Sequence, residues 1–329
     1  MSTTIEFGDP TLAAAMTRNL ARVEELLVAE LSHGEDFVVD KVTHLAVAGG
    51  KRFRPMFALL AAQYGQRPDA DEVIQAATVV EMTHLATLYH DDVMDEAERR
   101  RGVASANTRW SNSVAILAGD ILLAHASRVM AQLGTHTVAH FAQTFGELVT
   151  GQMRETVGPE GRDLIEHYLA VVHEKTGVLI SSAGYLGAYH SGAPADVTAA
   201  LREFGVNIGT VFQIVDDIID ILSPSLTSGK TPGTDLREGV FTLPVLLALR
   251  EEGPVGDELR GLLTGPLRDD DAAVERALHL LEQSQGKQEA LAVVEKYRAA
   301  ALAQLDLLPP GPATDALHAL TEYSVSRVR

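Results

Sequence analysis

Two clusters of aspartates have a spacing that suits metal binding. Both place carboxylates at positions i, i+1 and i+4: Asp91, Asp92 and Asp95 in the first cluster, and Asp216, Asp217 and Asp220 in the second. On a helix these positions fall within about 100° of arc, so the three carboxylates of a cluster face the same way. Close anions repel each other unless a cation bridges them, and oxygen ligands suit Mg²⁺ together with phosphate oxygens. Both clusters therefore predict Mg²⁺ sites.

The sequence around the two clusters differs in polarity. The first cluster lies at the end of an apolar helical pattern that starts at Val73, and by itself it could equally be a solvated acidic helix end. The second lies in almost wholly apolar sequence from Phe204 to Leu222, where ionised carboxylates need a charge partner. Two such clusters on separate helices predict facing walls of one cavity that clamp a metal-bound diphosphate.

Basic residues accompany the aspartates, although the protein as a whole carries a net charge of −18. Lys51 and Arg54 lie three residues apart at a predicted helix start, where backbone N–H groups also favour an anion. Further basic candidates follow in the chain: Arg99, Arg100 and Arg101 directly after the first cluster, then Lys175 and Lys230. Any one of them could be a surface charge, but arginine suits bidentate phosphate binding, and the set predicts diphosphate sites.

Helical patterning dominates the rest of the chain. Leu, Ala, Val and Ile recur at spacings of three and four in a series of segments: 12–31, 56–64, 73–94, 114–133, 138–149, 164–172, 178–189, 199–222, 243–249, 269–284, 287–305 and 313–328. Short breaks rich in Gly and Pro separate these segments, and none has the length of a domain linker. No run of alternating strands and hairpin turns is present. The sequence therefore predicts an all-α fold in a single domain over residues 1–329.

Composition excludes several classes of function. The absence of cysteine removes disulfides, thiolate metal sites and cysteine nucleophiles, and it is compatible with the cytoplasmic location that we expect. With 27 basic and 45 acidic residues, nucleic acid is not an expected partner. The opening residues MSTTIEFGDP lack the pattern of a signal peptide, and no apolar stretch of about 18 residues predicts a membrane span. Peripheral contact with a membrane, for product release, stays open.

Several short motifs, taken together in order and spacing, resemble the trans-polyprenyl diphosphate synthase family. They are Gly50-Lys51-Arg52-Phe53-Arg54-Pro55, Asp91-Asp92-Val93-Met94-Asp95 with Arg100-Arg101-Gly102, Lys175-Thr176, Phe212-Gln213, Asp216-Asp217-Ile218-Ile219-Asp220 and Gly229-Lys230. The resemblance implies an isoprenoid-synthase helical bundle around a deep central cavity, usually as a homodimer. It also implies a Mg²⁺-dependent prenyltransferase that joins isopentenyl diphosphate to an allylic diphosphate.

The resemblance further implies a role for each motif. The six aspartates would bind Mg²⁺. The diphosphate of isopentenyl diphosphate would be held by Gly50, Lys51, Arg54, His84 and Arg101. The allylic diphosphate would be held by Arg100, Lys175 and Lys230, with Thr176 and Gln213 at the reacting centre and Asp235 as an anchor for Lys230. Lys175, Thr176, Gln213 and Lys230 would form the catalytic group.

Small residues before the first aspartate cluster bear on product length. Helical turns back from Asp91 reach no aromatic residue over roughly 22 Å of helix: Thr87 with Ala86 beside it, Thr83, Val79 or Val80, and Ala76. In the family a large residue just before this cluster is typical of short products. Ala86, Thr87 and Thr83 therefore predict a long product, and the resemblance implies that it is all-trans, of the heptaprenyl to decaprenyl class and destined for quinone side chains. The alternative is that small residues only let two helices pack closely.

Four other functions compete with this prediction. A short-chain synthase would stop at farnesyl or geranylgeranyl diphosphate. A terpene cyclase usually replaces the second aspartate motif and needs no site for isopentenyl diphosphate. A non-catalytic partner subunit would lose Asp or Arg residues, and an acidic metal-binding scaffold would not explain the arginines.

Two positions depart from the family pattern, because no proline follows Gly102 and Ser111 stands where glycine is common. Phe141 and Phe145 are candidates for a tunnel floor, and Arg327 and Arg329 either cover the diphosphate site or form a frayed tail.

Overall fold

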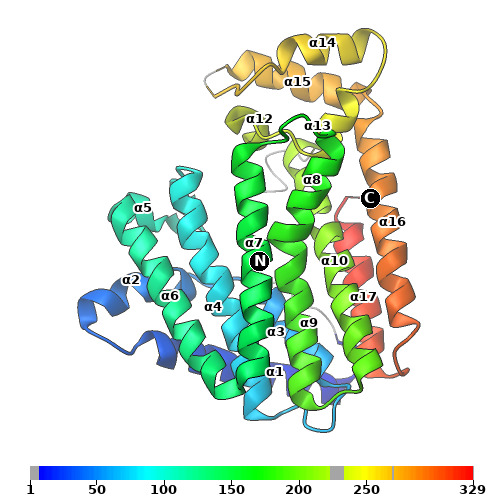
Figure 1. Ribbon diagram of the computed structural model, residues 1–329. Helices are drawn as coiled ribbons and strands as arrows, with labels where there is room; N and C mark the ends of the chain where they lie inside the picture. The colour runs from blue at the N-terminus through cyan, green and yellow to red at the C-terminus, as the bar shows by residue number, and fades with distance from the viewer. Residues whose placement is uncertain (1–6, 223–232, 269, 329) are drawn as a thin grey trace. The chain divides into compact units, whose positions relative to one another are not determined.

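The computed structural model describes residues 7–222, 233–268 and 270–328 (Figure 1). Within them, the helices of the first half are α1 (Pro10–Leu31), α2 (Asp36–Val47), α3 (Phe53–Ala62), α4 (Asp71–Met94), α5 (Ala106–Arg109), α6 (Asn112–Leu133), α7 (Thr135–Val157) and α8 (Leu164–Val172). The second half holds a π-helical turn, η1 (His173–Gly177), followed by α9 (Val178–Ser191), α10 (Ala195–Leu222), α12 (Thr234–Glu238), α13 (Leu243–Ala248), α14 (Pro254–Leu262), α15 (Asp271–Gln283), α16 (Gly286–Leu305) and α17 (Pro312–Ser326). The all-α prediction is confirmed.

Most of these helices coincide with the predicted segments, and α8 does so at both ends. Two helices of more than two turns were not predicted: α2, with 12 residues, and α14, with 9 residues. The sequence of α2, DFVVDKVTHLAV, is rich in β-branched residues, which have low intrinsic helix propensity. Its helix is stabilised by tertiary packing, because Val42, Leu45 and Ala46 are buried in a core cluster with side chains of α4 and α6.

A small hairpin interrupts the helices after α4. Strands β1 (Arg99–Arg100) and β2 (Val103–Ala104) pair antiparallel, with Arg99 opposite Ala104 and Arg100 opposite Val103. The two turn residues, Arg101 and Gly102, both have positive φ, at 53° and 80°, as a two-residue hairpin loop requires. This short hairpin was not predicted, because a two-residue strand is too short to show an alternating pattern.

The segment after the hairpin explains one departure from the family pattern. Ser111 precedes α6 in an extended conformation and its hydroxyl accepts a hydrogen bond from the Val114 N–H at 3.3 Å. A side-chain oxygen at this position satisfies one of the N–H groups that a helix start leaves unpaired, which glycine could not do. Ser111 therefore acts as the N-cap of α6.

The chain divides into two compact units, each assembled from several segments. Unit 1 takes residues up to Gly146, together with Leu179–Gly205 and Leu305–Leu317. Unit 2 takes Glu147–Val178, Val206–Gln304 and the residues from His318 onward. Each unit has its own buried apolar cluster. The prediction of one polyprenyl synthase domain over residues 1–329 stays a prediction, as does the deep central cavity.

The core of unit 1 depends on the pairing of α4 and α6, which lie side by side in Figure 1. Buried alanines and leucines of α6, among them Ala115, Ala118 and Leu122, share a cluster with Leu85 and Ala86 of α4. By length and composition α6 could cross a membrane, the one such helix among the residues described. Core helices of soluble proteins pass the same test, so the expectation of no membrane span stays a prediction.

Helices α3 and α9 of unit 1 approach each other closely. Every residue of α3 from Pro55 to Ala62 is buried, and two glycines of α9 face it. A Cβ atom at Gly184 would lie 2.6 Å from the Phe57 ring, and one at Gly187 would lie 2.0 Å from the Ala58 carbonyl oxygen. A backbone atom cannot rotate away as a side chain can, so Gly187 is required for this packing.

We expect Gly187→Ala to lower the free energy of unfolding by on the order of 3 kcal/mol, because its methyl group would force α3 and α9 apart. The measurement is denaturant unfolding followed by circular dichroism. The matched control is Gly146→Ala in α7, where nothing lies within 4 Å of an added Cβ atom. This control should stabilise the protein by about 0.5–1 kcal/mol, since alanine favours helix over glycine. Equal stability of the two variants would contradict the close packing of α3 and α9.

Candidate active site

The first aspartate motif lies at the C-terminal end of α4 in unit 1. Asp92 is fully buried, Asp91 is half-buried, and Asp95 is the exposed C-cap residue. The helix dipole places partial negative charge at a C-terminus, so carboxylates there are unfavourable without a cation. Burial raises the pKa of Asp92, although the Arg100 guanidinium beside it acts in the opposite direction.

Arg100 of β1 supplies part of the positive charge that this motif needs. Its Nε donates a hydrogen bond to Asp92 Oδ1 at 2.6 Å. The other oxygen, Asp92 Oδ2, is buried and has no hydrogen-bond partner in the part of the chain that the structure describes. A buried carboxylate oxygen without a donor is costly, and a divalent cation is a ligand that would satisfy it. The residues at the end of α4 therefore fit Mg²⁺.

A buried carboxylate, Glu81, organises the basic residues of unit 1. Glu81 lies in α4 with 2% of its surface exposed and accepts hydrogen bonds from Arg52 Nη1 at 2.8 Å and Arg101 Nη2 at 3.4 Å. Arg52 also pairs with Glu24 of α1. Neither glutamate was predicted as a site residue. Glu81 could have been found from the sequence, because it is an acidic residue inside the apolar run that starts at Val73. A buried carboxylate at such a position needs charge partners.

Both arginines bound to Glu81 also hold the C-terminal end of α2. Arg101 Nη1 donates to the carbonyls of Leu45 at 3.1 Å and Gly49 at 2.5 Å, and Arg52 Nη2 donates to the carbonyl of Ala46 at 2.9 Å. Cations are favourable there because the last carbonyls of a helix lack partners. Arg52 and Arg101 have left-handed backbone conformations, with φ of 48° and 53°. Such strain persists only where surrounding contacts fix it, and it is concentrated at functional sites.

The predicted site for isopentenyl diphosphate is largely gathered around this network. A Cβ atom at Gly50 would lie 2.9 Å from Arg101 Cζ, so the glycine lets the backbone contact the guanidinium. Lys51 is exposed beside it. Arg54 and His84 are each close enough to Arg101 for its charge to lower their pKa. The structure thus brings together four of the five residues, Gly50, Arg54, His84 and Arg101, and leaves Lys51 in solvent.

Arg54 and His84 have different charge states. Burial, with a smaller contribution from Arg101, lowers the pKa of Arg54 to about 10, which leaves the guanidinium charged at neutral pH. Its Nε is buried and has no acceptor among the described residues. Burial, followed by the charges of Arg54 and Arg101, lowers the pKa of His84 well below its usual range, so the ring is neutral. An unpaired buried guanidinium nitrogen is suited to an anionic ligand.

The second aspartate motif lies on α10 in unit 2. Asp217 is buried and accepts hydrogen bonds from the Tyr168 hydroxyl and, at 2.9 Å, from Gln213 Nε2. Burial raises the pKa of Asp217 to about 6; those two hydrogen bonds lower it, and the neighbouring charges of Asp216 and Asp220 raise it. A carboxylate in this environment is stabilised by an added cation. Tyr168 was not predicted as a site residue, since nothing in its local sequence separates it from a core tyrosine.

The other two carboxylates of this motif have protein partners as well. Asp216 Oδ1 lies 2.7 Å from Arg327 Nη2, and the Arg327 guanidinium lies 5.7 Å from the centre of the Phe212 ring. Asp220 Oδ2 accepts a hydrogen bond from the Asp235 backbone N–H at 3.3 Å. Lys230, which Asp235 was expected to anchor, lies outside the described residues, together with Gly229 and Arg329.

Lys175 and Thr176, which were predicted to be catalytic, lie in the π-helical turn η1. A π-helical turn inserts one residue into an α-helix and is frequent at functional sites. Thr176 Oγ1 donates a hydrogen bond to Gln213 Oε1 at 3.2 Å, and Lys175 Nζ pairs with Glu155 Oε2 at 2.5 Å. The hydrogen bonds from Thr176 to Gln213 and from Gln213 to Asp217 connect the predicted reacting centre to the second aspartate motif.

The chain-length residues lie along α4 of unit 1. Thr83 and Ala86 are fully buried, and Thr87 is half-buried. Ala86 belongs to the cluster that α4 shares with α6, so its small side chain also serves helix packing. The rings of Phe141 and Phe145 are nearly parallel, with centroids 5.9 Å apart, and they pack in or against the same cluster. Whether Phe141 and Phe145 form the floor of a tunnel stays a prediction.

The predicted site residues thus form one group in each unit. The facing arrangement of the two aspartate motifs concerns residues of both units and stays a prediction. Among residues 7–222, 233–268 and 270–328, no three His, Asp or Glu side chains are gathered as a complete metal site. Such a site would rely on phosphate oxygens and water to complete the coordination, which is usual for Mg²⁺.

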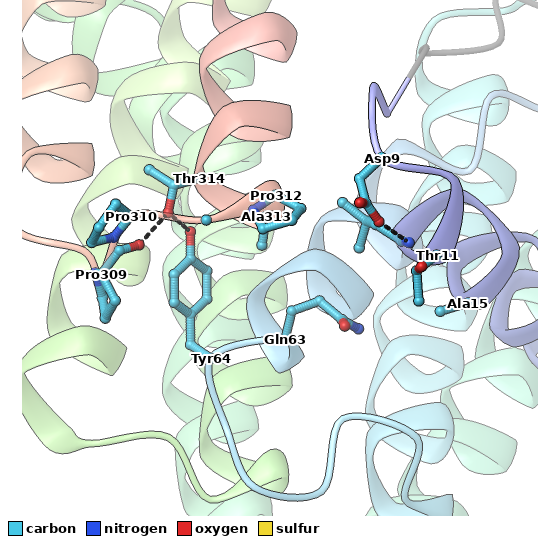
Figure 2. A pocket seen from close by; sticks show the side chains of 12 residues that line it. Asp9, Thr11, Ala15, Gln63, Tyr64, Pro309, Pro310, Pro312, Ala313 and Thr314 are labelled. Atoms are coloured by element: carbon cyan, nitrogen blue, oxygen red, sulfur yellow. Dashed lines mark hydrogen bonds between the residues drawn. The ribbon is translucent and has the colours of Figure 1, made fainter.

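A pocket of about 570 Å³ lies elsewhere in unit 1, and no predicted site residue lines it. It is formed by the start of α1, the end of α3 and the proline-rich segment before α17 (Figure 2). The Tyr64 hydroxyl and Thr314 Oγ1 share a hydrogen bond of 2.8 Å there, and Thr314 Oγ1 donates to the Pro309 carbonyl at 2.6 Å. These bonds are explained by the packing of α17 onto α3.

Comparisons with known proteins agree with the pattern of motifs. The chain is 56% identical over 324 residues to nonaprenyl diphosphate synthase of Mycobacterium tuberculosis, which covers 98% of this chain and 96% of that protein. It is also similar to the structure of geranylgeranyl pyrophosphate synthase from Corynebacterium glutamicum, complexed with calcium and isoprenyl diphosphate. That match has 64% identity and a TM-score of 0.91, and covers 98% of this chain and 99% of that one.

A more distant structure has the same fold. The chain matches a decaprenyl diphosphate synthase from Rhodobacter capsulatus at 31% identity and a TM-score of 0.88, over 97% of this chain and 99% of that one. The family model described as polyprenyl synthetase matches residues 36–281, which include both aspartate motifs and the basic residues between them. The predicted isoprenoid-synthase helical fold is confirmed, and the chain belongs to the polyprenyl synthetase family.

Proposed function

We propose that this chain is a Mg²⁺-dependent trans-polyprenyl diphosphate synthase that adds isopentenyl diphosphate repeatedly to an allylic diphosphate. The observation that carries the proposal is a pair of unsatisfied polar atoms in unit 1. Asp92 Oδ2 lacks a donor and Arg54 Nε lacks an acceptor among the residues described, and both are buried. A metal-bound diphosphate offers a cation to the first and phosphate oxygens to the second.

The side chains act mainly by binding and by excluding water. By the resemblance, the allylic diphosphate would be held by Arg100, Lys175 and Lys230, and isopentenyl diphosphate by the residues around Arg101. The allylic carbon–oxygen bond breaks, the double bond of isopentenyl diphosphate attacks that carbon, and a proton leaves the new chain for the released diphosphate. Thr176 and Gln213 line the reacting centre. Ile214, Val215 and Ile218, the buried apolar residues around Asp217 on α10, would exclude water, which would otherwise hydrolyse a cationic intermediate.

Mg²⁺ fits the residues of both aspartate motifs, and Asp91, Asp92, Asp95 and Asp216, with Asp217 and Asp220, would hold it. When bound, it supplies positive charge that stabilises diphosphate as a leaving group. The calcium ion named with the Corynebacterium glutamicum structure supports a divalent cation in such a site.

A long product, of the heptaprenyl to decaprenyl class, is supported by two similar proteins named as nonaprenyl and decaprenyl diphosphate synthases. It is also supported by Thr87, whose small side chain is half-buried just before the first motif. The Corynebacterium glutamicum protein is named for a geranylgeranyl product, so a shorter chain is the second candidate. The cytoplasmic location and the quinone side chain as the product's destination stay predictions.

We also propose a homodimer, because one face of α6 in unit 1 is apolar and exposed. Ile116 and Leu117 are 44% and 59% exposed, and Val138 of α7 is 42% exposed. Neighbouring exposed apolar side chains are typical of association surfaces. A second copy of this chain is the partner that the resemblance implies.

The first experiment is incorporation of labelled isopentenyl diphosphate with Mg²⁺ and, in parallel, dimethylallyl, geranyl, farnesyl and geranylgeranyl diphosphates. We expect products of heptaprenyl length or longer after dephosphorylation, and a shift to shorter products in Thr87→Phe because the ring obstructs the growing tail. Ala142→Phe adds the same ring at an exposed position of α7 and should leave product length unchanged. If the wild-type product stops at geranylgeranyl diphosphate, the prenyl transfer reaction would be supported and the prediction of a long-chain product would be refuted. No incorporation from folded protein would refute the synthase.

The second prediction concerns the aspartate motifs. Asp91→Ala and Asp216→Ala should each lower kcat by roughly 10²–10⁴-fold and weaken Mg²⁺ binding measured by calorimetry, because each removes a cation ligand. Thermal melts should stay close to wild type. Asp257→Ala, which removes an exposed carboxylate paired with Arg260, is the control and should keep full activity. Near-normal turnover in both Asp91→Ala and Asp216→Ala would refute the proposal that the two aspartate motifs bind the metal ions of a metal-bound diphosphate.

The third prediction tests the dimer. Leu117→Glu places a charge at the centre of the exposed apolar face of α6 and should convert the dimer to a monomer in light scattering after gel filtration. Ala272→Glu adds the same charge at an exposed position of α15 and is the control for a change of charge alone. A wild-type chain that elutes as a monomer at micromolar concentration would rule the dimer out.

A further inference from the structure

The Tyr89 side chain connects α4 to α2 through its hydroxyl group. Tyr89 is fully buried and lies in α4, two residues before Asp91. Its hydroxyl donates to the Lys41 carbonyl at 2.5 Å and accepts from the Leu45 N–H at 3.2 Å. Lys41 and Leu45 are four residues apart in α2, so these are the two groups that an α-helix pairs with each other. The hydroxyl also lies 3.4 Å from the Val42 carbonyl oxygen, so it contacts three backbone groups of α2.

Leu45 is held at both of its backbone groups. Its N–H donates to Tyr89, and its carbonyl accepts from Arg101 Nη1 at 3.1 Å. The same Nη1 donates to the Gly49 carbonyl at 2.5 Å, just after the end of α2. The orientation of the Arg101 guanidinium therefore depends on where the last turn of α2 lies. Tyr89 fixes that turn from one side, and Glu81 holds the guanidinium from the other at 3.4 Å.

Core packing alone does not explain the hydroxyl. Tyr89 belongs to the apolar cluster with Leu45, Leu85 and Ala86, where phenylalanine would fill almost the same volume. Placing a hydroxyl in such a core is unfavourable unless it forms hydrogen bonds, so its benefit must come from the groups it bonds. Those groups lie in the helix whose C-terminal carbonyls orient Arg101 and whose end leads into Gly50 and Lys51.

We propose that Tyr89 is a positioning residue for isopentenyl diphosphate, acting through Leu45 to orient the Arg101 guanidinium. The inference rests on the proposed function, which assigns Arg101 to the diphosphate of this substrate. Without the hydroxyl, the Lys41 carbonyl and the Leu45 N–H would lose their hydrogen bonds to α4, and the last turn of α2 would no longer be held against that helix. The carbonyls of Leu45 and Gly49 would then move with that turn, and Arg101 would follow them.

The test compares Tyr89→Phe with Tyr64→Phe. The control also removes one hydroxyl from unit 1, where Tyr64 bonds Thr314 at 2.8 Å and touches no predicted site residue. For Tyr89→Phe we expect KM for isopentenyl diphosphate, and its Kd measured by calorimetry without a primer, to rise on the order of 10-fold. In the same variant kcat and KM for the allylic primer should stay within about 2-fold of wild type. Tyr64→Phe should leave all these constants unchanged.

A merely structural role would give a different pattern, because a destabilised fold lowers the active fraction and hence kcat while leaving both KM values alone. That pattern, or an unchanged Kd for isopentenyl diphosphate in Tyr89→Phe, would overturn the inference and leave the proposed function standing. A wild-type chain that neither binds nor incorporates isopentenyl diphosphate would overturn both. As a second measurement, Tyr89→Phe should have no further effect on Kd in an Arg101→Gln background, because coupled residues are non-additive. Additive effects would refute the route through Arg101.

Discussion

The neutralisation of Glu81 is the interaction on which unit 1 depends. A carboxylate with 2% of its surface exposed is stable only with charge partners and hydrogen bonds, and Arg52 and Arg101 provide both. The same guanidinium groups donate to carbonyls in the last turn of α2, Arg52 to Ala46 and Arg101 to Leu45. One buried negative charge thereby fixes two arginines, the end of α2 and the loop through Gly50. Arg52 keeps a left-handed backbone conformation there because its guanidinium is held by Glu24, Glu81 and Ala46 at once, whereas the positive φ of Arg101 belongs to its hairpin turn.

The carboxylates of the aspartate motifs are less fully compensated by positive charge than Glu81 is. This difference distinguishes a carboxylate that stabilises the fold from carboxylates available to bind a ligand. Glu81 is paired with two cations, whereas Asp92 has one oxygen bound to Arg100 and the other without a donor among the described residues. On α10, Asp217 relies on neutral donors, Tyr168 and Gln213, and its pKa is raised to about 6. A fold that satisfied every carboxylate internally would leave no affinity for a metal-bound diphosphate. The unsatisfied groups are those that the proposed chemistry would use.

Local backbone irregularities position several of the predicted site residues. Arg100 and Arg101 lie in a two-residue hairpin, Lys175 and Thr176 lie in a π-helical turn, and Asp95 caps α4. In a regular α-helix, side chains at these spacings would lie along one face of the helix. Each irregularity of the backbone instead points a site side chain in a different direction. Apolar packing of α4 on α6 supplies the rigid support, because its buried cluster fixes the helix that carries the first motif.

The sequence by itself determined the helical class, most helix boundaries and the identity of the motifs, because these depend on local periodicity and on residue type. The 3.6-residue pattern in Leu164–Val172 is enough to place α8, and two aspartate clusters at i, i+1 and i+4, taken together with the basic residues, are enough to predict cation and diphosphate sites. Only the tertiary structure decided which groups are satisfied. Several of these outcomes depend on contacts between residues distant in the chain. They are the pairing of Glu81 with Arg52 and Arg101, the contact of Tyr168 with Asp217, the formation of helix α2, and the hydrogen bond of the Tyr89 hydroxyl to that helix. Burial and hydrogen bonding across elements set those outcomes, and neither can be inferred from the spacing of residues along one helix.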